Sequence, residues 1–125
     1  TCLQSAGDME DPMTLSERFQ KLLKKHCSKN PKAVKPGDLE FDLAELPGWT
    51  IENKSIKKRF DFKDFHETMK FVNAVADIAN QEDHHPDMAV SYNHCTVTYS
   101  THSVGEVTDN DFICAAKVQA LSSRQ

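Results

Sequence analysis

The sequence of 125 residues lacks any apolar run near the ~18 residues that a membrane-spanning helix needs, so no membrane span is expected. It also lacks internal repeats and low-complexity tracts. Positive charge is not in excess, because 15 Lys and Arg stand against 19 Asp and Glu and give a formal charge of −4. That balance argues against a nucleic-acid binder, and we interpret the basic runs KLLKKH and IKKRF as solvent-exposed faces.

The four cysteines form no C-x-x-C pair and show no metal-ligand spacing. Cys95 and Cys114 fall among apolar residues, where a free thiol packs as a small hydrophobic side chain. We therefore expect a reducing compartment, most simply the cytoplasm. The chain begins at Thr1 rather than Met, which leaves an organelle open, since a targeting segment upstream would not be visible.

What is present is the composition of one soluble globular domain, with 38% hydrophobic and 27% charged residues. Residues 1–13 have no periodicity and are expected to be mobile. TLSE at 14–17 has the form of a capping box, and helical spacing continues to about Lys25. Prolines and a glycine predict a loop over 26–38, and one or two helical turns are expected over 39–46. The apolar positions of the first helix are Leu15, Phe19 and Leu22.

Alternating residues predict two β-hairpins, one folded about Asn53-Lys54 and one about Asn93-His94. One face of each hairpin is apolar and the other polar, as in a sheet with one buried face. The expected apolar positions are Ile51, Ile56, Phe60 and Phe62, then Val90, Tyr92, Cys95, Val97 and Tyr99. The expected polar positions include Lys57, Arg59 and Asp61, then Thr96, Thr98 and Ser100.

The clearest helix is predicted over residues 61–81, with an apolar stripe at steps of three and four. The stripe consists of Phe65, Met69, Val72, Ala76 and Ala79. A last helix begins at TDND, where Thr108 is the expected N-cap and Asp111 the third helical position. The order helix, hairpin, helix, hairpin, helix predicts an α+β fold, a four-stranded antiparallel sheet with helices packed on one face.

Two adjacent histidines stand where the long helix gives way to the second hairpin. Pro86 restricts His85 to extended backbone angles and so ends the helix before the pair. Asp83 precedes the pair, and its carboxylate could fix the tautomer of one ring or favour its charged form. His102 follows the fourth expected strand and could return to the same corner. Imidazoles titrate near neutral pH, so such a cluster suits proton transfer.

Two other interpretations compete with this one. Surface histidines at a turn by chance are the plainer alternative. A metal site is less favoured, because neighbouring histidines seldom point at one ion from extended backbone and no Cys or carboxylate spacing completes a tetrahedral set. The remaining histidines are interpreted as surface residues; they are His26, His66 and His94.

The stretch EDHHPDMAVSYNHCTVTYSTHSVGEVTDNDFICAAKVQAL, with LPGWTIENKSIKKRFDFKDFHETMKFVNAVADIA before it, resembles the pterin-4a-carbinolamine dehydratase family. The likeness covers residues 39–121, with the family's intervals between His84-His85-Pro86, Tyr92, Thr101-His102 and Asp111. It implies a dehydratase-like domain over 39–125 after an N-terminal extension over 1–38, the same four-stranded fold, and a homodimer or homotetramer.

The resemblance implies removal of water from 4a-hydroxytetrahydropterin to give quinonoid dihydropterin, a step of tetrahydrobiopterin recycling, with no metal or organic cofactor. The departing hydroxyl needs a proton while the N5–H group loses one, and groups that titrate near neutral pH do both. Carried over by position, the acid–base set is His84, His85 and His102. Within it we expect His84 and His102 to transfer protons and His85 to position the ring or the hydroxyl. The implied pterin contacts are His84, His85 and Pro86, then Thr101, His102, Ser103 and Val104, with Asp83 in support.

Three departures from the family pattern are expected to affect affinity and substrate preference more than the reaction: Asn80, where an acidic residue is common, Met88, where an aromatic is common, and Glu106, where glycine is common. The family also implies a different role as an alternative. Some relatives act as a dimerisation cofactor, a transcriptional coactivator, for a homeodomain transcription factor, and some assist assembly of a carbon-fixing enzyme. A helical surface with Phe19 and Leu22 would suit such a role, but we expect this helix rather to cover the protein's own sheet or a neighbouring subunit. The complete histidine set favours the enzyme.

Overall fold

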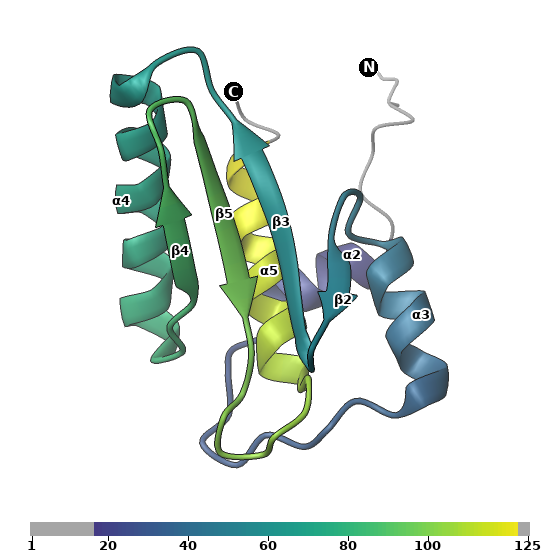
Figure 1. Cartoon of the computed structure of the whole chain (residues 1–125). Helices are drawn as coiled ribbons and strands as arrows, with labels where there is room; N and C mark the ends of the chain where they lie inside the picture. Colours follow the sequence, from purple (N-terminus) through teal and green to yellow (C-terminus); the bar gives the residue numbers. More distant parts are fainter. Residues whose placement is uncertain (1–16, 123–125) are drawn as a thin grey trace, which may run out of the picture.

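The computed structural model describes residues 17–122, in which four strands form one antiparallel sheet in the order β2-β3-β5-β4 (Figure 1). The TLSE stretch lies outside this range except for Glu17. No helix within it is long and apolar enough to cross a bilayer. The strands are β2 (Thr50–Glu52), β3 (Ser55–Asp61), β4 (Asp87–Val90) and β5 (His94–Tyr99), and the helices are α2 (Glu17–Lys24), α3 (Pro36–Ala44), α4 (Phe65–Glu82) and α5 (Asp109–Ser122).

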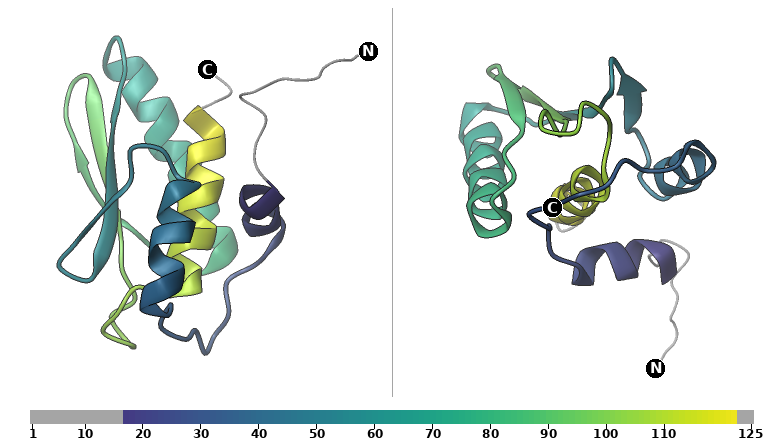
Figure 2. Two further views of the ribbon diagram at one scale, coloured as in Figure 1. Left: turned by 90° about the vertical axis from the view of Figure 1, so that its right-hand side faces the viewer. Right: turned by 90° about the horizontal axis from the view of Figure 1, so that it is seen from below.

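The helices α4 and α5 cover one face of the sheet, and α2 lies beyond α5 as a further layer (Figure 2). No helix of residues 17–122 covers the opposite face of the sheet. This arrangement confirms the predicted α+β fold. Phe19 and Leu22 of α2 are buried in the common core, so the apolar face of this helix packs within its own chain.

The register of the central strands confirms the predicted alternation. Ile56 pairs with Tyr99 and Phe60 with Cys95, and all four side chains are buried. Lys58 lies on the same inner face, where its ammonium donates to the Pro47 carbonyl and to Gln119 Oε1, at 2.8 and 2.9 Å. Burial lowers the pKa of Lys58. On the other face Arg59 and Asp61 are exposed, as predicted.

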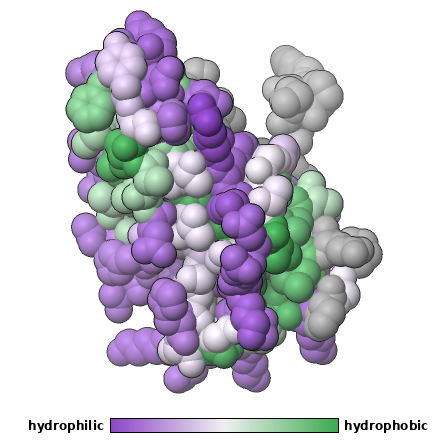
Figure 3. Space-filling model, viewed as in Figure 1, coloured by the Kyte–Doolittle hydropathy of each residue, from purple (hydrophilic) through white to green (hydrophobic). Residues whose placement is uncertain are grey.

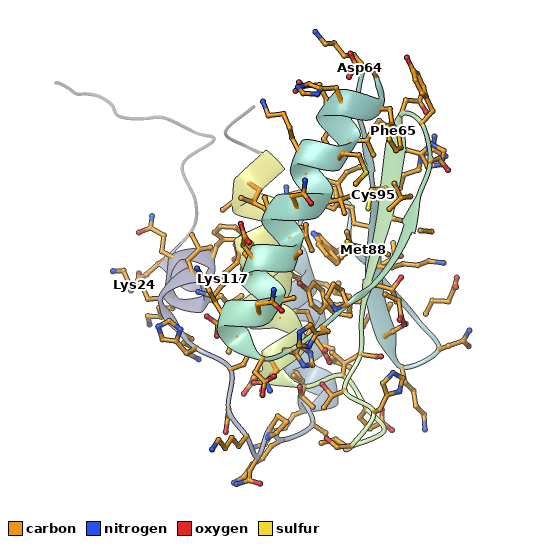
Figure 4. The ribbon with its side chains drawn as sticks, turned by 90° about the vertical axis from the view of Figure 1, so that its left-hand side faces the viewer. Lys24, Asp64, Phe65, Met88, Cys95 and Lys117 are labelled. Carbon is orange, nitrogen blue, oxygen red and sulfur yellow. The ribbon has the colours of Figure 1, made fainter. Side chains whose placement is uncertain are left out.

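The helix α4 buries a different stripe from the predicted one. Asp64 caps its N-terminus by accepting from the Glu67 amide, and Phe65 beside it is 48% exposed (Figure 4). The helix carries apolar residues on two adjacent stripes, so spacing alone did not separate them. Phe71 decides between the two, because its ring packs against Phe60 and Phe62 at centroid distances of 4.6 and 5.1 Å. The buried positions are Thr68, Phe71, Val75, Ala79 and Glu82.

Two smaller expectations were also wrong. The helix α3 begins at Pro36, inside the segment predicted as a loop, because the fixed φ and missing N–H of proline suit the first turn of a helix. The apolar side chains of Ile51, Val90 and Tyr92, expected on the buried face, are 40%, 41% and 64% exposed. Among the described residues β2 pairs only with β3 and β4 only with β5, so both strands form edges of the sheet and have little to pack against.

Candidate active site

The predicted site residues lie at one end of the sheet, where α4 ends, β4 begins, β5 ends and α5 begins (lower end in Figure 1). The helix α4 ends at Glu82, and Asp83 follows in the left-handed conformation with φ 52°. The Asp83 and His84 amides both donate to the Ala79 carbonyl. The chain thus leaves the helix immediately before the histidine pair, as predicted.

The His84 ring is held from two sides. Its Nε2 lies 2.7 Å from Asp111 Oδ1, and its face stacks on the Tyr99 ring at a centroid distance of 5.7 Å and 12° between planes. Only 12% of the side chain is exposed. Because an ionised carboxylate accepts and does not donate, we assign the Nε2 proton to this hydrogen bond. Nδ1 is then the nitrogen available for exchange with another molecule.

Asp111 is completely buried and uses both carboxylate oxygens. Its Oδ2 accepts from Thr101 Oγ1 and from the Thr108 amide, each at 2.9 Å. The Thr101 and Thr108 hydroxyls lie 2.7 Å apart. The predicted cap at Thr108 is therefore confirmed, and the capping carboxylate also orients His84. Charge-assisted hydrogen bonds of this kind are the strong ones in a protein interior.

The carboxylate that is hydrogen-bonded to the His84 ring thus belongs to Asp111 and not to Asp83, the partner that the sequence predicts. Asp83 is exposed, and within residues 17–122 its side chain makes no hydrogen bond. Adjacency along the chain favoured Asp83, but its left-handed cap conformation leaves its side chain in solvent. Asp111 stands at the family's interval in the resemblance, whereas the local sequence predicts only a helix-capping role for it.

His102 lines a hollow of about 370 Å³ at this end of the sheet. Asp87 of β4, Lys54 of the β2–β3 turn and Thr101 line the same hollow. Thr101 also donates to Asp111, which holds His84, so two hydrogen bonds link the hollow to the His84 ring. His102, Ser103 and Val104 are exposed. A larger hollow, of about 690 Å³ between α2 and the 32–38 segment, contains none of the predicted site residues.

His85 is exposed, with Nε2 3.3 Å from Asn80 Oδ1. Within the described part of the chain no hydrogen bond or ring contact directly joins two of the imidazoles of His84, His85 and His102. The same residues include no group of three or more His, Cys, Asp or Glu placed to hold a metal ion. The site therefore brings together the segments that carry the histidines, and the hollow of about 370 Å³ lies beside His102.

All three departures from the family pattern lie in or near this end of the molecule. Asn80 contacts His85, as described. Glu106 forms a 3.5 Å ion pair with Lys54, which lines the hollow. Met88 packs, half-buried, against the core near α4 (Figure 4). The three departures therefore change side chains in or near the surroundings of the histidines, while all three histidines themselves are retained.

Comparison of the sequence with known protein families shows to which family the chain belongs. The family model described as "Pterin 4 alpha carbinolamine dehydratase" matches residues 32–121. The chain belongs to this family. A protein of Bdellovibrio bacteriovorus named "Putative pterin-4-alpha-carbinolamine dehydratase" is 44% identical over 108 residues, which cover 83% of this chain and 90% of the relative. A protein of Chromobacterium violaceum with the same name is 57% identical over 82 residues, covering 66% and 76%.

Solved structures agree on the fold. A transcriptional coactivator/pterin dehydratase from Brucella melitensis superposes with a TM-score of 0.70 and 33% identity, covering 72% of this chain and 98% of that one. A pterin dehydratase-like protein identified as a RuBisCO assembly factor in the alpha-carboxysome has a TM-score of 0.51 at 21% identity, covering 59% and 86%. The second likeness shows the fold alone. The pterin dehydratase fold thus occurs in proteins described with different roles.

Proposed function

We propose that this protein removes water from 4a-hydroxytetrahydropterin and releases quinonoid dihydropterin, as a step of tetrahydrobiopterin recycling. The observation that carries the proposal is the hydrogen-bonded path from His84 through Asp111 to Thr101, which lines the hollow of His102. Membership of the pterin dehydratase family and the names of the relatives support the same reaction.

In the proposed reaction the C4a–O bond breaks and its oxygen takes a proton to leave as water, while the N5–H proton passes to a base and its electron pair forms the C4a–N5 double bond. His84 and His102 supply the acid and the base, and His85 orients the substrate. No electrons pass to a second molecule, so the proposal includes no metal or organic cofactor. Positioned acids and bases typically accelerate such a step by ~10²–10⁴-fold.

Turnover of freshly generated 4a-hydroxytetrahydropterin tests this function. Wild-type protein should accelerate the appearance of quinonoid dihydropterin, followed by its absorbance, well above the uncatalysed rate. The rate should vary with pH between about 5 and 8, where imidazoles in general change protonation. A rate equal to that of buffer across this range would refute the proposal.

The proposal includes a homodimer in which a second copy of the chain packs along β4. Within the part of the chain that the structure describes, this edge strand has a hydrogen-bonded neighbour on one side only. Phe65, Val90 and Tyr92 are exposed beside it, and apolar surface gathers at the upper left of the molecule in Figure 3, over the start of α4 and the end of β4. Exposed edges of this kind favour strand pairing between chains.

Sedimentation velocity tests the dimer. Wild-type protein should sediment as a dimer or a larger even oligomer, and Val90→Lys should shift it toward the monomer, because a lysine on the edge opposes pairing. Lys70→Ala, an exposed substitution on α4, is the control and should leave the oligomer unchanged. A monomeric wild-type protein at micromolar concentration would contradict this part of the proposal.

A further inference from the structure

Two free thiols lie side by side outside the proposed active site. Cys27 Sγ and Cys114 Sγ are 3.4 Å apart, although the residues are 87 positions apart in the sequence. Cys27 follows α2 and is half-buried, whereas Cys114 lies on α5 and is completely buried. Neither is in a disulfide. A contact this close joins the segment after α2 to the helix at the centre of the molecule.

Hydrogen bonds from two helices fix the segment that carries Cys27. The Cys27 amide donates to Glu82 Oε1 at 2.8 Å. The Ser28 amide donates to Asn110 Oδ1, and Asn110 Nδ2 donates back to the Ser28 carbonyl, both at 2.9 Å. Asn110 stands one turn before Cys114 on α5. These hydrogen bonds fix the backbone at Cys27, so the short distance between the two sulfur atoms does not depend on the rotamer of one side chain alone.

Glu82 is the buried anchor of this arrangement, with 4% of its side chain exposed. It accepts from His26 Nδ1 at 2.9 Å, and Lys117 Nζ lies 3.9 Å from the same carboxylate. Lys117 also donates to the Leu23 carbonyl at 2.7 Å, which ties α5 to α2 (Figure 4). Burial alone would raise the pKa of Glu82, but the hydrogen bonds from Cys27 and His26 and the charge of Lys117 lower it overall. The carboxylate thus stays ionised near neutral pH and keeps the segment in place.

We propose that Cys27 and Cys114 form an oxidation site that closes to an intramolecular disulfide when the protein meets a hydroperoxide. The Cys27 thiolate attacks the peroxide, the O–O bond breaks, and Cys27 sulfenic acid and water form (alcohol, for an organic hydroperoxide). The Cys114 sulfur then attacks the sulfenic sulfur, the S–S bond forms, and a second water leaves. The two thiols together lose two electrons and two protons, and the peroxide is reduced.

The environment of each thiol sets this order. Cys27 is the half-exposed partner and the one that a peroxide reaches from solvent. Cys114 shares a hydrogen bond with Cys27 and is buried, and both effects raise its pKa. A buried thiol of raised pKa is a poor first nucleophile, but it lies where a sulfenic acid on Cys27 would form. Closure would join the segment after α2 to α5 covalently until the disulfide is reduced.

The test uses the full reduced chain, treated with hydrogen peroxide, quenched with catalase without alkylation, and compared with the untreated reduced chain. The expected result is an intact mass lower by about 2 Da than that of the reduced protein, with one peptide joining Cys27 to Cys114. The thermal midpoint should rise on the order of 10 °C, because a cross-link over a long loop restricts the unfolded chain. Reduction by dithiothreitol should reverse both changes.

The variant Cys27→Ser should abolish the mass loss and the rise in midpoint, and since Cys27 is half-exposed this change is compatible with folding. Cys114→Ala should do the same. Cys95→Ala removes another buried thiol and leaves the pair intact, so it should retain both changes. Oxidation that only adds oxygen to Cys27, or a disulfide that joins other cysteines, would overturn the proposal.

Discussion

Replacing His102 by alanine is expected to lower kcat by ~10²–10⁴-fold, the largest loss of activity that we predict for a single site. The side chain is exposed in the hollow and makes no hydrogen bond within residues 17–122, so its truncation removes the proposed proton-transfer group without opening the core. The thermal midpoint should stay within the range of a surface substitution. Turnover of 4a-hydroxytetrahydropterin and a thermal melt of the same preparation measure the two effects.

His66→Ala is the matched control for this prediction. His66 is also an exposed histidine, but it lies in the first turn of α4, at the other end of that helix from the histidine pair. This variant should retain wild-type turnover. Equal rates for His102→Ala and His66→Ala would remove His102 from the proposed acid–base pair.

Asp111→Ala is expected to have the largest effect on stability, about 3–5 kcal/mol. The substitution leaves the Thr101 hydroxyl and the Thr108 amide without their buried acceptor and frees the His84 ring. Chemical denaturation followed by circular dichroism measures the loss. Asp109→Ala is the control, since Asp109 is exposed in the first turn of the same helix and should cost at most about 1 kcal/mol.

The variant Asp111→Asn tests whether Asp111 orients the His84 ring in addition to stabilising the fold. The asparagine amide has the same size as the carboxylate, but only its oxygen accepts a hydrogen bond, while its NH₂ group donates. The NH₂ group should therefore face a donor, either His84 Nε2–H or the Thr101 hydroxyl. We expect kcat to fall roughly 10²-fold or more, with a changed pH profile and little change in KM. A variant that unfolds more easily yet retains the wild-type pH profile would limit Asp111 to a structural role.

Local periodicity predicted most of the helices and strands, but it did not predict which face of the helix α4 is buried. Cys95, Val97 and Tyr99 alternate with polar residues and are buried as expected, because a strand has only two faces. The helix α4 has apolar residues on two stripes, and only the contact of Phe71 with Phe60 and Phe62 selects one of them. That choice depends on residues in another element, which spacing along the helix does not report.

The partners within the candidate site were harder to predict for the same reason. His84 and Asp111 are 27 residues apart, and nothing local distinguishes Asp111 from the nearer Asp83. The left-handed cap at Asp83 turns that residue away, and the start of α5 brings Asp111 in. The contact of Cys27 with Cys114 likewise spans 87 positions and leaves no spacing signature. Tertiary packing creates these pairs.

The account depends most on the claim that one pterin lies against His84, His85 and His102, and histidine ring resonances followed by NMR test it most directly. The full chain would be titrated with an oxidised pterin, which carries no 4a-hydroxyl and does not react. The three resonances should shift together with a single Kd, while those of His66 and His94 at the opposite end of the sheet stay in place. Saturable shifts confined to His66 or His94, or no saturable shift at His84 and His102, would contradict the claim.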